Sequence, residues 1–269
     1  MKSRLETLIA TVAPALLLWT LGTASLNAAL LPATESASVW NSQWRNHGWG
    51  GNQPDAFQKL EIGGGGDFKF RSWLQVDLQS FKNLDETSPF TFADLNLRVD
   101  RADYTSPTLG GSITIYGLLP SSTNPYYNWT NNPQGSYQDL PYAWGTTPAP
   151  SAGSDLVSLG TITIPTQDNA PAQGTIFSGA NGQISWTGTE LVDWLNQVVD
   201  TTRGDGSSFA TFIFGEPSSD IAKLRFYGSY DANESFRPTL DYVAIPEPST
   251  LMLFGIALVS GLVALRRRG

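Results

Sequence analysis

The fold class of this chain is decided by the stretch Phe68-Lys69-Phe70-Arg71-Ser72-Trp73-Leu74-Gln75-Val76-Asp77-Leu78. Mainly apolar residues recur at every second position, and mainly polar residues stand between them. Successive side chains of a β-strand point to opposite faces, so this period of two predicts a strand with one buried face. The glycines at 63–66 predict a turn just before this strand.

Similar segments recur along the chain and predict further strands, at residues 92–100, 112–118, 156–164, 209–214, 223–227 and 238–244. One segment differs. Thr187 and Glu190 have the spacing of a capping box, and an apolar stripe at helical spacing follows at Leu191, Trp194, Leu195, Val198 and Val199. Many short strands with one helix predict an all-β fold, a single jelly-roll-like β-sandwich with one short helix.

The last 24 residues have another organisation. Pro246, Glu247 and Pro248 precede fifteen apolar or small residues at 251–265, and a stop-transfer cluster follows at Arg266, Arg267 and Arg268. Fifteen helical residues span only about 22 Å, whereas the hydrocarbon core of a membrane is about 30 Å thick. The segment is therefore predicted to be a transmembrane helix suited to temporary residence, with its arginines in the cytoplasm. An ordinary C-terminal anchor is the alternative.

The N-terminus has the features of a secretory signal peptide. Lys2 and Arg4 precede an apolar stretch at 8–21, and small residues follow that permit cleavage after Ala24 or Ala28. The chain is therefore divided into a signal peptide at 1–28, one domain at 29–245 and a sorting segment at 246–269. Between the two ends, 11 Lys and Arg stand against 22 Asp and Glu, a net charge of about −11.

This composition excludes several classes of function. An acidic surface repels nucleic acid and anionic membranes. The chain has no cysteine and a single histidine, His47, which removes cysteine-based zinc sites and Cys–His nucleophiles. Phe, Trp and Tyr make up 12% of the residues, and together with the many small and turn-forming residues this is typical of an all-β extracellular domain.

The C-terminal arrangement of Pro246-Glu247-Pro248, short apolar helix and arginine cluster resembles the PEP-CTERM sorting signal of Gram-negative bacteria. In that family the signal is read by exosortase, a membrane protease-transferase. The resemblance implies a protein that is exported, held transiently in the inner membrane, processed by exosortase, and delivered to the cell surface or the extracellular matrix, often in organisms that make exopolysaccharide or biofilm.

The domain also resembles the DNRLRE-type β-sandwich domains. The similarity lies in five motifs that occur in the expected order: the strands at 71–78 and 94–99, Trp144-Gly145-Thr146-Thr147-Pro148, the helix at 189–195, and Ser235-Phe236-Arg237-Pro238-Thr239-Leu240. Val76 stands where that family usually has Phe, and residues 124–142 form a longer insertion. The family contains carbohydrate-binding modules and surface adhesins, so the resemblance implies the fold and a glycan-related role.

Two groups of residues are candidate binding sites. Aromatic side chains that stack on sugars crowd into one predicted loop, at Tyr126, Tyr127, Trp129, Tyr142 and Trp144, although packing over a sandwich edge would also use them. Asp231, Asn233 and Glu234, with Asp220, offer oxygen ligands for Ca²⁺, or else form a solvated acidic loop.

We therefore expect a non-catalytic surface or matrix protein that binds or organises extracellular polysaccharide. The alternative is a polysaccharide-degrading enzyme, a lyase or glycosidase, built on the same sandwich. Such an enzyme would need two carboxylates facing one another, and no spacing in the sequence singles out a pair.

Overall fold

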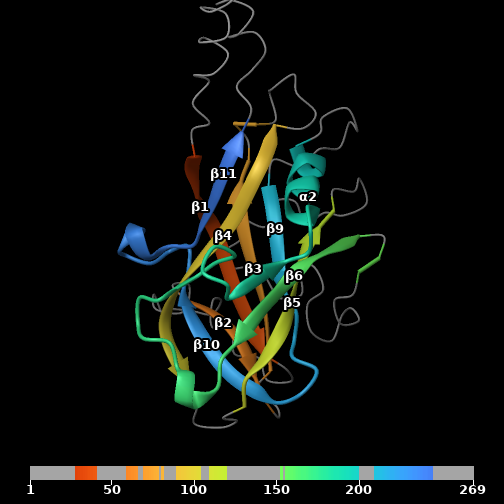
Figure 1. Cartoon of the computed structure of the whole chain (residues 1–269). Coiled ribbons are helices and arrows are strands. Elements are labelled where there is room, and N and C mark those ends of the chain that lie inside the picture. The colour runs from red at the N-terminus through yellow and green to blue at the C-terminus, as the bar shows by residue number, and fades with distance from the viewer. Residues whose placement is uncertain are drawn as a thin grey trace, which may run out of the picture.

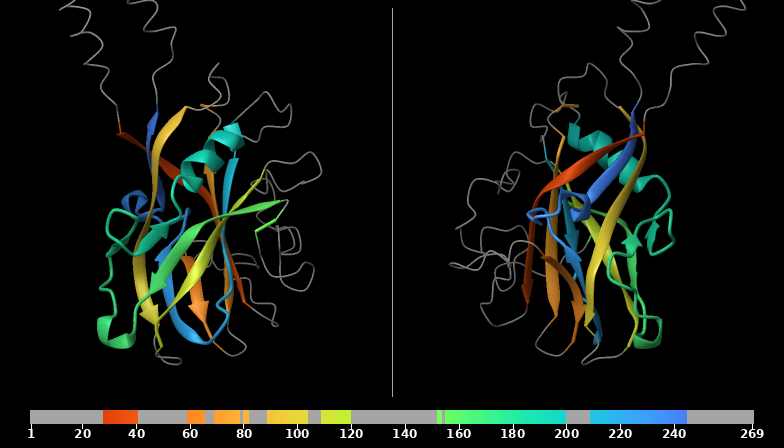
Figure 2. Two further views of the ribbon diagram at one scale, coloured as in Figure 1. Left: turned by 45° about the vertical axis from the view of Figure 1, so that its right-hand side comes forward. Right: turned by 90° about the vertical axis from the view of Figure 1, so that its left-hand side faces the viewer.

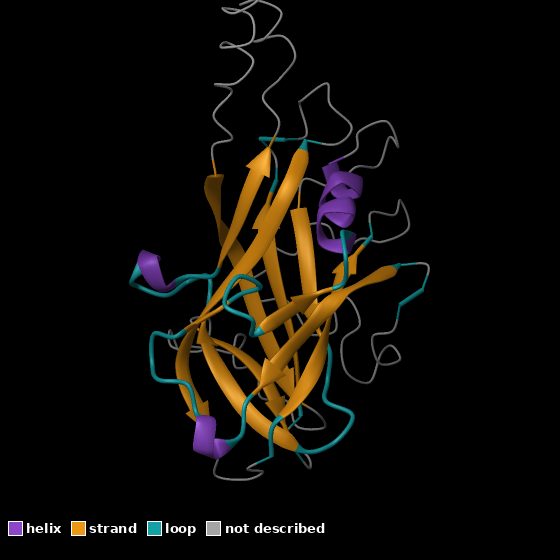
Figure 3. Cartoon of the chain, viewed as in Figure 1, coloured by secondary structure: helices purple, strands orange, loops and turns teal. Residues whose placement is uncertain are grey.

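The computed structural model describes residues 28–40, 59–65, 69–78, 80–81, 89–103, 109–119, 152–153, 155–199 and 209–244. Its main elements are strands (Figures 1 and 3). They are β1 (Ala28–Trp40), β2 (Lys59–Gly64), β3 (Phe70–Asp77), β4 (Phe90–Asp103), β5 (Gly111–Leu118), β6 (Leu156–Ile164), β7 (Ile176–Phe177), β8 (Ile184–Trp186), β9 (Phe209–Phe214), β10 (Ile221–Tyr227) and β11 (Thr239–Ala244). The helix α2 (Glu190–Val199) and the short 3-10 helices η4 (Gln167–Asn169) and η6 (Glu234–Phe236) complete the described part.

The strands pair in the order β1-β11-β4-β10-β2-β3-β9-β5-β6-β8, all antiparallel, and β7 also pairs with β4. The long strand β1 pairs with β11 through its first residues and with β3 through its later ones. It therefore connects two distant positions in the strand order, and the sheet folds back on itself (Figure 2). The all-β class with a single α-helix in the described part is confirmed. The jelly-roll assignment stays a prediction.

The hydrophobic core lies between the two parts of this folded sheet. One side contributes Leu95, Leu97 and Val99 of β4 and Leu224 and Phe226 of β10, all buried. The other side contributes buried residues of β9, β5 and β6, at Ala210, Phe212, Phe214, Ile113, Ile115, Leu159 and Ile162. In β4, β5 and β10 these residues alternate with mainly polar ones, as period-two patterning requires.

The helix closes one end of this core. Its buried residues are those that the sequence predicted, Leu191, Trp194, Leu195, Val198 and Val199. The predicted start is shifted: the helix begins at Glu190, after Thr189, whose hydroxyl donates to the Asp193 carboxylate at 2.7 Å. Asn196 fixes the helix to β4, because its side-chain amide bonds to both the N–H and the carbonyl of Phe90.

The strand on which the fold prediction rested forms as expected, but the prediction that it has one buried face is wrong. The residues on its second face, Arg71, Trp73 and Gln75, are 1%, 0% and 0% exposed. Arg71 is buried because its guanidinium pairs with Glu216, with 2.8 Å between Nη2 and Oε2. The Gln75 amide donates to the Thr211 hydroxyl at 3.1 Å. Polar side chains are thus buried here with polar partners on distant segments.

The contact between α2 and β5 leaves no room for a side chain at Gly117. A Cβ there would lie 2.4 Å from the indole of Trp194, which is 1% exposed and donates from Nε1 to the Leu118 carbonyl. We expect Gly117→Ala to lower the free energy of unfolding by about 1–3 kcal/mol, the usual cost of overpacking a core. Urea denaturation measures the change. In a Trp194→Phe background the same substitution should cost less, and an equal cost in both backgrounds would contradict this account.

The predicted membrane segments, the signal peptide and the C-terminal helix, lie outside the described residues. Within the described ranges, no helix has the length and apolar character needed to cross a membrane.

Candidate functional site

The basic residues of this acidic domain gather in one region. Neighbouring strands and their loops carry all eight Lys and Arg that the structure describes. These are Lys59, Lys69, Arg71, Arg98, Arg101, Lys223, Arg225 and Arg237, on or beside β2, β3, β4, β10 and the segment after β10. Acidic partners accompany them, so the region is a mixed-charge face rather than a cationic patch.

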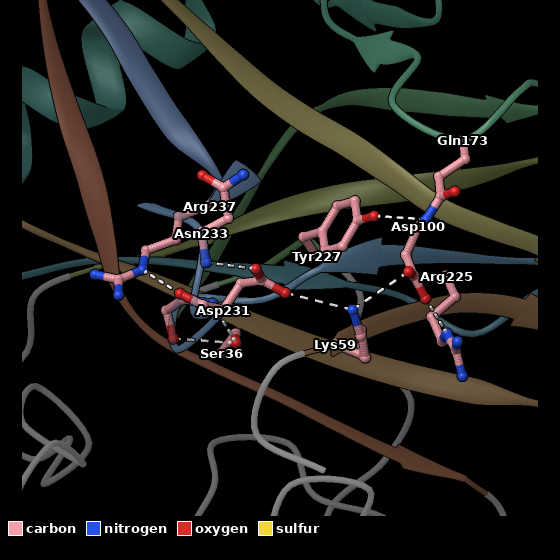
Figure 4. Close-up of polar contacts among 10 residues, drawn as sticks. Ser36, Lys59, Asp100, Gln173, Arg225, Tyr227, Asp231, Asn233 and Arg237 are labelled. Atoms are coloured by element: carbon pink, nitrogen blue, oxygen red, sulfur yellow. Dashed lines mark hydrogen bonds and ion pairs between the residues drawn. The ribbon is translucent and has the colours of Figure 1, made fainter. Parts of the chain in front are cut away.

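Lys59, the first residue of β2, is the centre of this face (Figure 4). Its ammonium lies 3.3 Å from Oδ1 of Asp100 and 3.4 Å from Oδ2 of Asp231, which come from β4 and from the segment after β10. The same nitrogen lies 4.1 Å from the ring centroid of Tyr227, a cation–π contact. The three charged side chains are 19%, 10% and 9% exposed, so water screens these ion pairs weakly.

A second set of contacts fixes the other end of the cluster. Asp100 also accepts a hydrogen bond from Nε of Arg225 at 2.6 Å. The Gln173 amide donates to the Tyr227 hydroxyl at 2.8 Å. Asp100 is presented at a bulge, because β10 pairs with β4 through Arg101 and Val99 and skips the residue between them. The bulge therefore aims this carboxylate at two cations.

Residues 228–238, here called the β10–β11 loop, cover one side of the cluster. Asp231 holds the loop, because its Oδ1 accepts from the Asn233 N–H at 2.9 Å while Oδ2 meets Lys59. Its carbonyl accepts from Nε of Arg237 at 2.9 Å. Ser229 adds a contact to β1 through the hydroxyl of Ser36, at 3.1 Å. Four strands, β1, β2, β4 and β10, the β10–β11 loop and the segment before β7 are thus joined through one polar cluster.

Three of the predicted calcium ligands lie in this loop and the fourth, Asp220, lies just before β10, but each has a protein partner. Asp231 pairs with Lys59, and the Asn233 side chain caps η6 by accepting from the Ser235 N–H. Glu234 has an 82% exposed side chain that lies 3.5 Å from Arg237. Asp220 pairs with Lys69 at 3.8 Å. Within the described segments, no three His, Cys, Asp or Glu residues are grouped as metal ligands. Calcium binding stays a prediction, and it would require Lys59 to release Asp231.

The outer rim of the cluster is accessible. The side chains of Lys223, Arg225 and Arg237 are 22–28% exposed, and the neighbouring Tyr230 is 44% exposed. The rim therefore offers hydrogen-bond donors, and the β10–β11 loop that borders it carries an accessible aromatic ring. Arg225 is held by Asp100, Arg237 by the Asp231 carbonyl, and Lys223 by Glu61 at 3.4 Å.

A second polar group contains two carboxylates directly opposite each other, Asp94 on β4 and Asp241 on β11. Asp94 is 5% exposed and accepts three hydrogen bonds, from the N–H groups of Gly179 and Ala180 and from the Trp186 indole, at 2.8–2.9 Å. Oδ1 of Asp241 is buried and has no hydrogen-bond partner among the described residues. Burial, and then the charge of Asp94, raise the pKa of Asp241, although a hydrogen bond with Asn96 lowers it.

This arrangement predicts that Asp241→Asn raises the free energy of unfolding by an amount that depends on pH. A carboxyl group whose pKa is raised by folding favours the folded state at low pH, and this contribution is lost as the pH rises through the folded-state pKa. We therefore expect the variant to be more stable at pH 7 by about 0.2–1 kcal/mol, the scale of a cross-strand pair, and the gain to disappear near pH 3. Urea denaturation at both pH values measures it. Asp168→Asn, at an exposed position in η4, is the control, and a loss of stability at pH 7 would contradict the expectation.

The remaining predicted site residues fall outside the described residues. These are the aromatic residues Tyr126, Tyr127, Trp129, Tyr142 and Trp144, the motif Pro246-Glu247-Pro248 and the arginines 266–268. The Lys59 cluster, in turn, was not predicted. Its only sequence signal is the alternation of Lys223, Arg225 and Tyr227 with apolar residues, which marks a polar face without naming partners more than a hundred residues away.

Residues 244–268 match the model of the PEP-CTERM protein-sorting motif. The predicted sorting signal is thereby confirmed. The motif indicates an exported protein that exosortase processes, and it implies passage through the inner membrane to the cell surface. A comparison with curated proteins gave no match.

Proposed function

We propose that this protein is a non-catalytic component of the cell surface or extracellular matrix that binds or organises extracellular polysaccharide. The observation that carries the proposal is the sorting motif joined directly to the folded domain: the match begins at Ala244, the last residue of β11. The sorting signal is thus attached directly to a β-rich domain. We further propose that this domain is a DNRLRE-like, jelly-roll β-sandwich, on the resemblance of its strand motifs.

Two of those motifs have clear structural roles, which supports the resemblance. Arg71 of the first motif is buried against Glu216, and Leu240 of the closing motif lies in the core. Arg237, also in the closing motif, bonds to the Asp231 carbonyl and so fixes the β10–β11 loop. Of these three motif residues, Arg237 therefore fixes the loop beside the Lys59 cluster, whereas Arg71 and Leu240 belong to the buried interior.

The rim of the Lys59 cluster is the surface that we propose for glycan contact. Sugar hydroxyls need donors and acceptors held in fixed positions, and sugar faces pack on aromatic rings. Arg225 and Arg237 supply the donors, and Tyr230 supplies an exposed ring. The loop aromatics Tyr127 and Trp144 stay predicted contacts of the same kind.

A polysaccharide array probed with the processed protein tests this function. We expect retention on at least one polysaccharide, with a Kd that rises threefold to tenfold in Tyr230→Ala, the scale of one lost ring contact. Trp144→Ala and Tyr127→Ala should also weaken retention. Leu109→Ala, at a residue of 62% exposure outside the loop, is the control. Absence of binding to every polysaccharide would contradict the proposal.

Polysaccharide cleavage is the second candidate, and one observation favours it. Asp241 has a raised pKa and lies opposite a second carboxyl group, Asp94. A carboxylic acid with a raised pKa beside another carboxyl group is what acid–base cleavage of a glycosidic bond needs. The three hydrogen bonds that Asp94 accepts give that residue a structural role already. Reducing ends released from a polysaccharide by the normal protein, and not by Asp241→Asn, would establish this candidate in place of the first.

A further inference from the structure

The start of β1 and the end of β11 lie side by side. The first residue of β1, Ala28, pairs with Val243, the last but one residue of β11. Val243 in turn pairs with Phe92 near the start of β4. In Figure 1 this end lies at the top, where β11 ends next to β1. The sorting segment therefore continues from this end of the domain.

An exposed apolar patch lies at the same end. Leu30 of β1 is 63% exposed and Phe92 of β4 is 50% exposed, and partly exposed Val243 of β11 lies between their strands. Residues that pair across antiparallel strands share a face, as do residues two apart in one strand. The pairings of Ala28 with Val243 and of Val243 with Phe92 therefore put these three side chains on one face. The same face carries Asp241, which pairs with Leu30 and is partly exposed.

The patch is the outer surface of a rigid end of the sheet. On the opposite face, the rings of Phe81, Phe90 and Tyr242 contact one another, with centroids 4.7–5.8 Å apart. Phe90 reaches that face although it is two residues from Phe92, because the pairing register of β4 with β11 shifts between them. Phe81 and Phe90 are buried. Leu30 and Phe92 thus have a fixed position, and their exposure is not the result of a loosely packed strand end.

The distance to the membrane is short. Six residues, 245–250, separate β11 from the apolar segment at 251–265, and an extended chain of that length spans at most about 20 Å. The described residues of this end, at 28–32, 90–97 and 239–244, include no Lys or Arg. Among these described residues no cation attracts anionic headgroups, and an apolar contact is the force that they offer. Leu and Phe are residues that bury in the boundary between headgroups and acyl chains.

We propose that the patch of Leu30, Phe92 and Val243 rests on the lipid surface of the membrane while the sorting segment is inserted. The domain is then held in one orientation, with the end that bears the termini against the bilayer. The opposite end of the long strand β4, near Asp103, faces away from the membrane.

The absence of cysteine from the chain permits a direct test. The full chain is reconstituted in phosphatidylcholine vesicles, with and without phosphatidylglycerol, after a fluorophore is attached to Leu30→Cys, Phe92→Cys or Leu109→Cys. Leu109 is the matched control, because it is 62% exposed and its carbonyl accepts from the N–H of Ala222, beside the far end of β4. Lipids with a quencher near the headgroup report contact.

We expect at least threefold stronger quenching of the labels at positions 30 and 92 than of the label at 109, in both lipid mixtures. Equal quenching at the three positions would overturn the proposal. Quenching at 30 and 92 that appears only when exosortase is added would also overturn it, because the patch would then bind the enzyme and not the lipid. Unchanged circular dichroism of each labelled variant checks that the sheet is intact.

Discussion

Replacing Glu247 with alanine is expected to leave the precursor uncleaved and bound to the membrane. The residue is the only acidic one in the sorting motif that matches residues 244–268, and exosortase processing depends on recognition of that motif. We expect processed protein to fall at least tenfold, since a lost buried charge contact costs about 1.5–3 kcal/mol and each 1.4 kcal/mol is a factor of ten. Immunoblots of membrane and released fractions measure the two forms.

Glu234→Ala is the control for this experiment. Glu234 also lies close to the C-terminal strand, but its side chain is 82% exposed and its contact is with Arg237 in the β10–β11 loop. Processing of this variant should be normal. If Glu247→Ala were released as efficiently as Glu234→Ala, the tail would act only as an anchor, and the sorting account would be wrong.

The largest effect on stability is expected from Lys59→Met. The substitution keeps the length of the side chain but removes the cation between Asp100 and Asp231, whose side chains are 10% and 9% exposed. Removing one partner from a buried ion pair costs about 3–5 kcal/mol, and the partial exposure of Lys59 places the expected loss near the lower limit, about 3 kcal/mol. Urea denaturation at pH 7 measures the free energy of unfolding.

Lys69→Met makes the same chemical change at an exposed pair. Lys69 lies 3.8 Å from Asp220, whose side chain is 56% exposed, so the expected loss is below about 1 kcal/mol. Equal losses in the two variants would show that the Lys59 cluster does not stabilise the face as described. The comparison therefore separates a cation held between two buried carboxylates from one that faces an exposed carboxylate.

Most strands were predictable because each carries its own signal. The alternation of apolar and polar residues predicted β6 and β9 with their observed bounds. It predicted the bounds of β4, β5, β10 and β11 to within a few residues. β2 was missed because its last residues, Gly63 and Gly64, have the composition of a turn. They also have positive φ values of 95° and 103°, which glycine adopts easily. β1 was missed because its sequence, Ala28–Trp40, has no clear alternation of apolar and polar residues and contains Pro32.

The second buried face of β3 and the Lys59 cluster could not be predicted, for a common reason. Arg71 and Gln75 look like solvent-facing residues in the sequence, because their partners Glu216 and Thr211 are more than 130 residues away. Likewise, nothing near Lys59 in the sequence indicates Asp231. Local patterns predict on which face of a strand a residue lies. The hydrogen-bond and ion-pair partners that stabilise a buried polar side chain are set by the tertiary fold.

The central claim is that the tail sorts the exported protein to the cell surface and that the domain then associates with extracellular polysaccharide. The most direct measurement is to isolate matrix from the host, digest its polysaccharide with glycosidases, and follow the processed protein by immunoblot. The account predicts that processed protein sediments with intact matrix and is released when the polysaccharide is digested. It also predicts that the Tyr230→Ala variant is released before any digestion. Processed protein that is soluble before digestion, or that stays sedimented after complete digestion, would contradict the account.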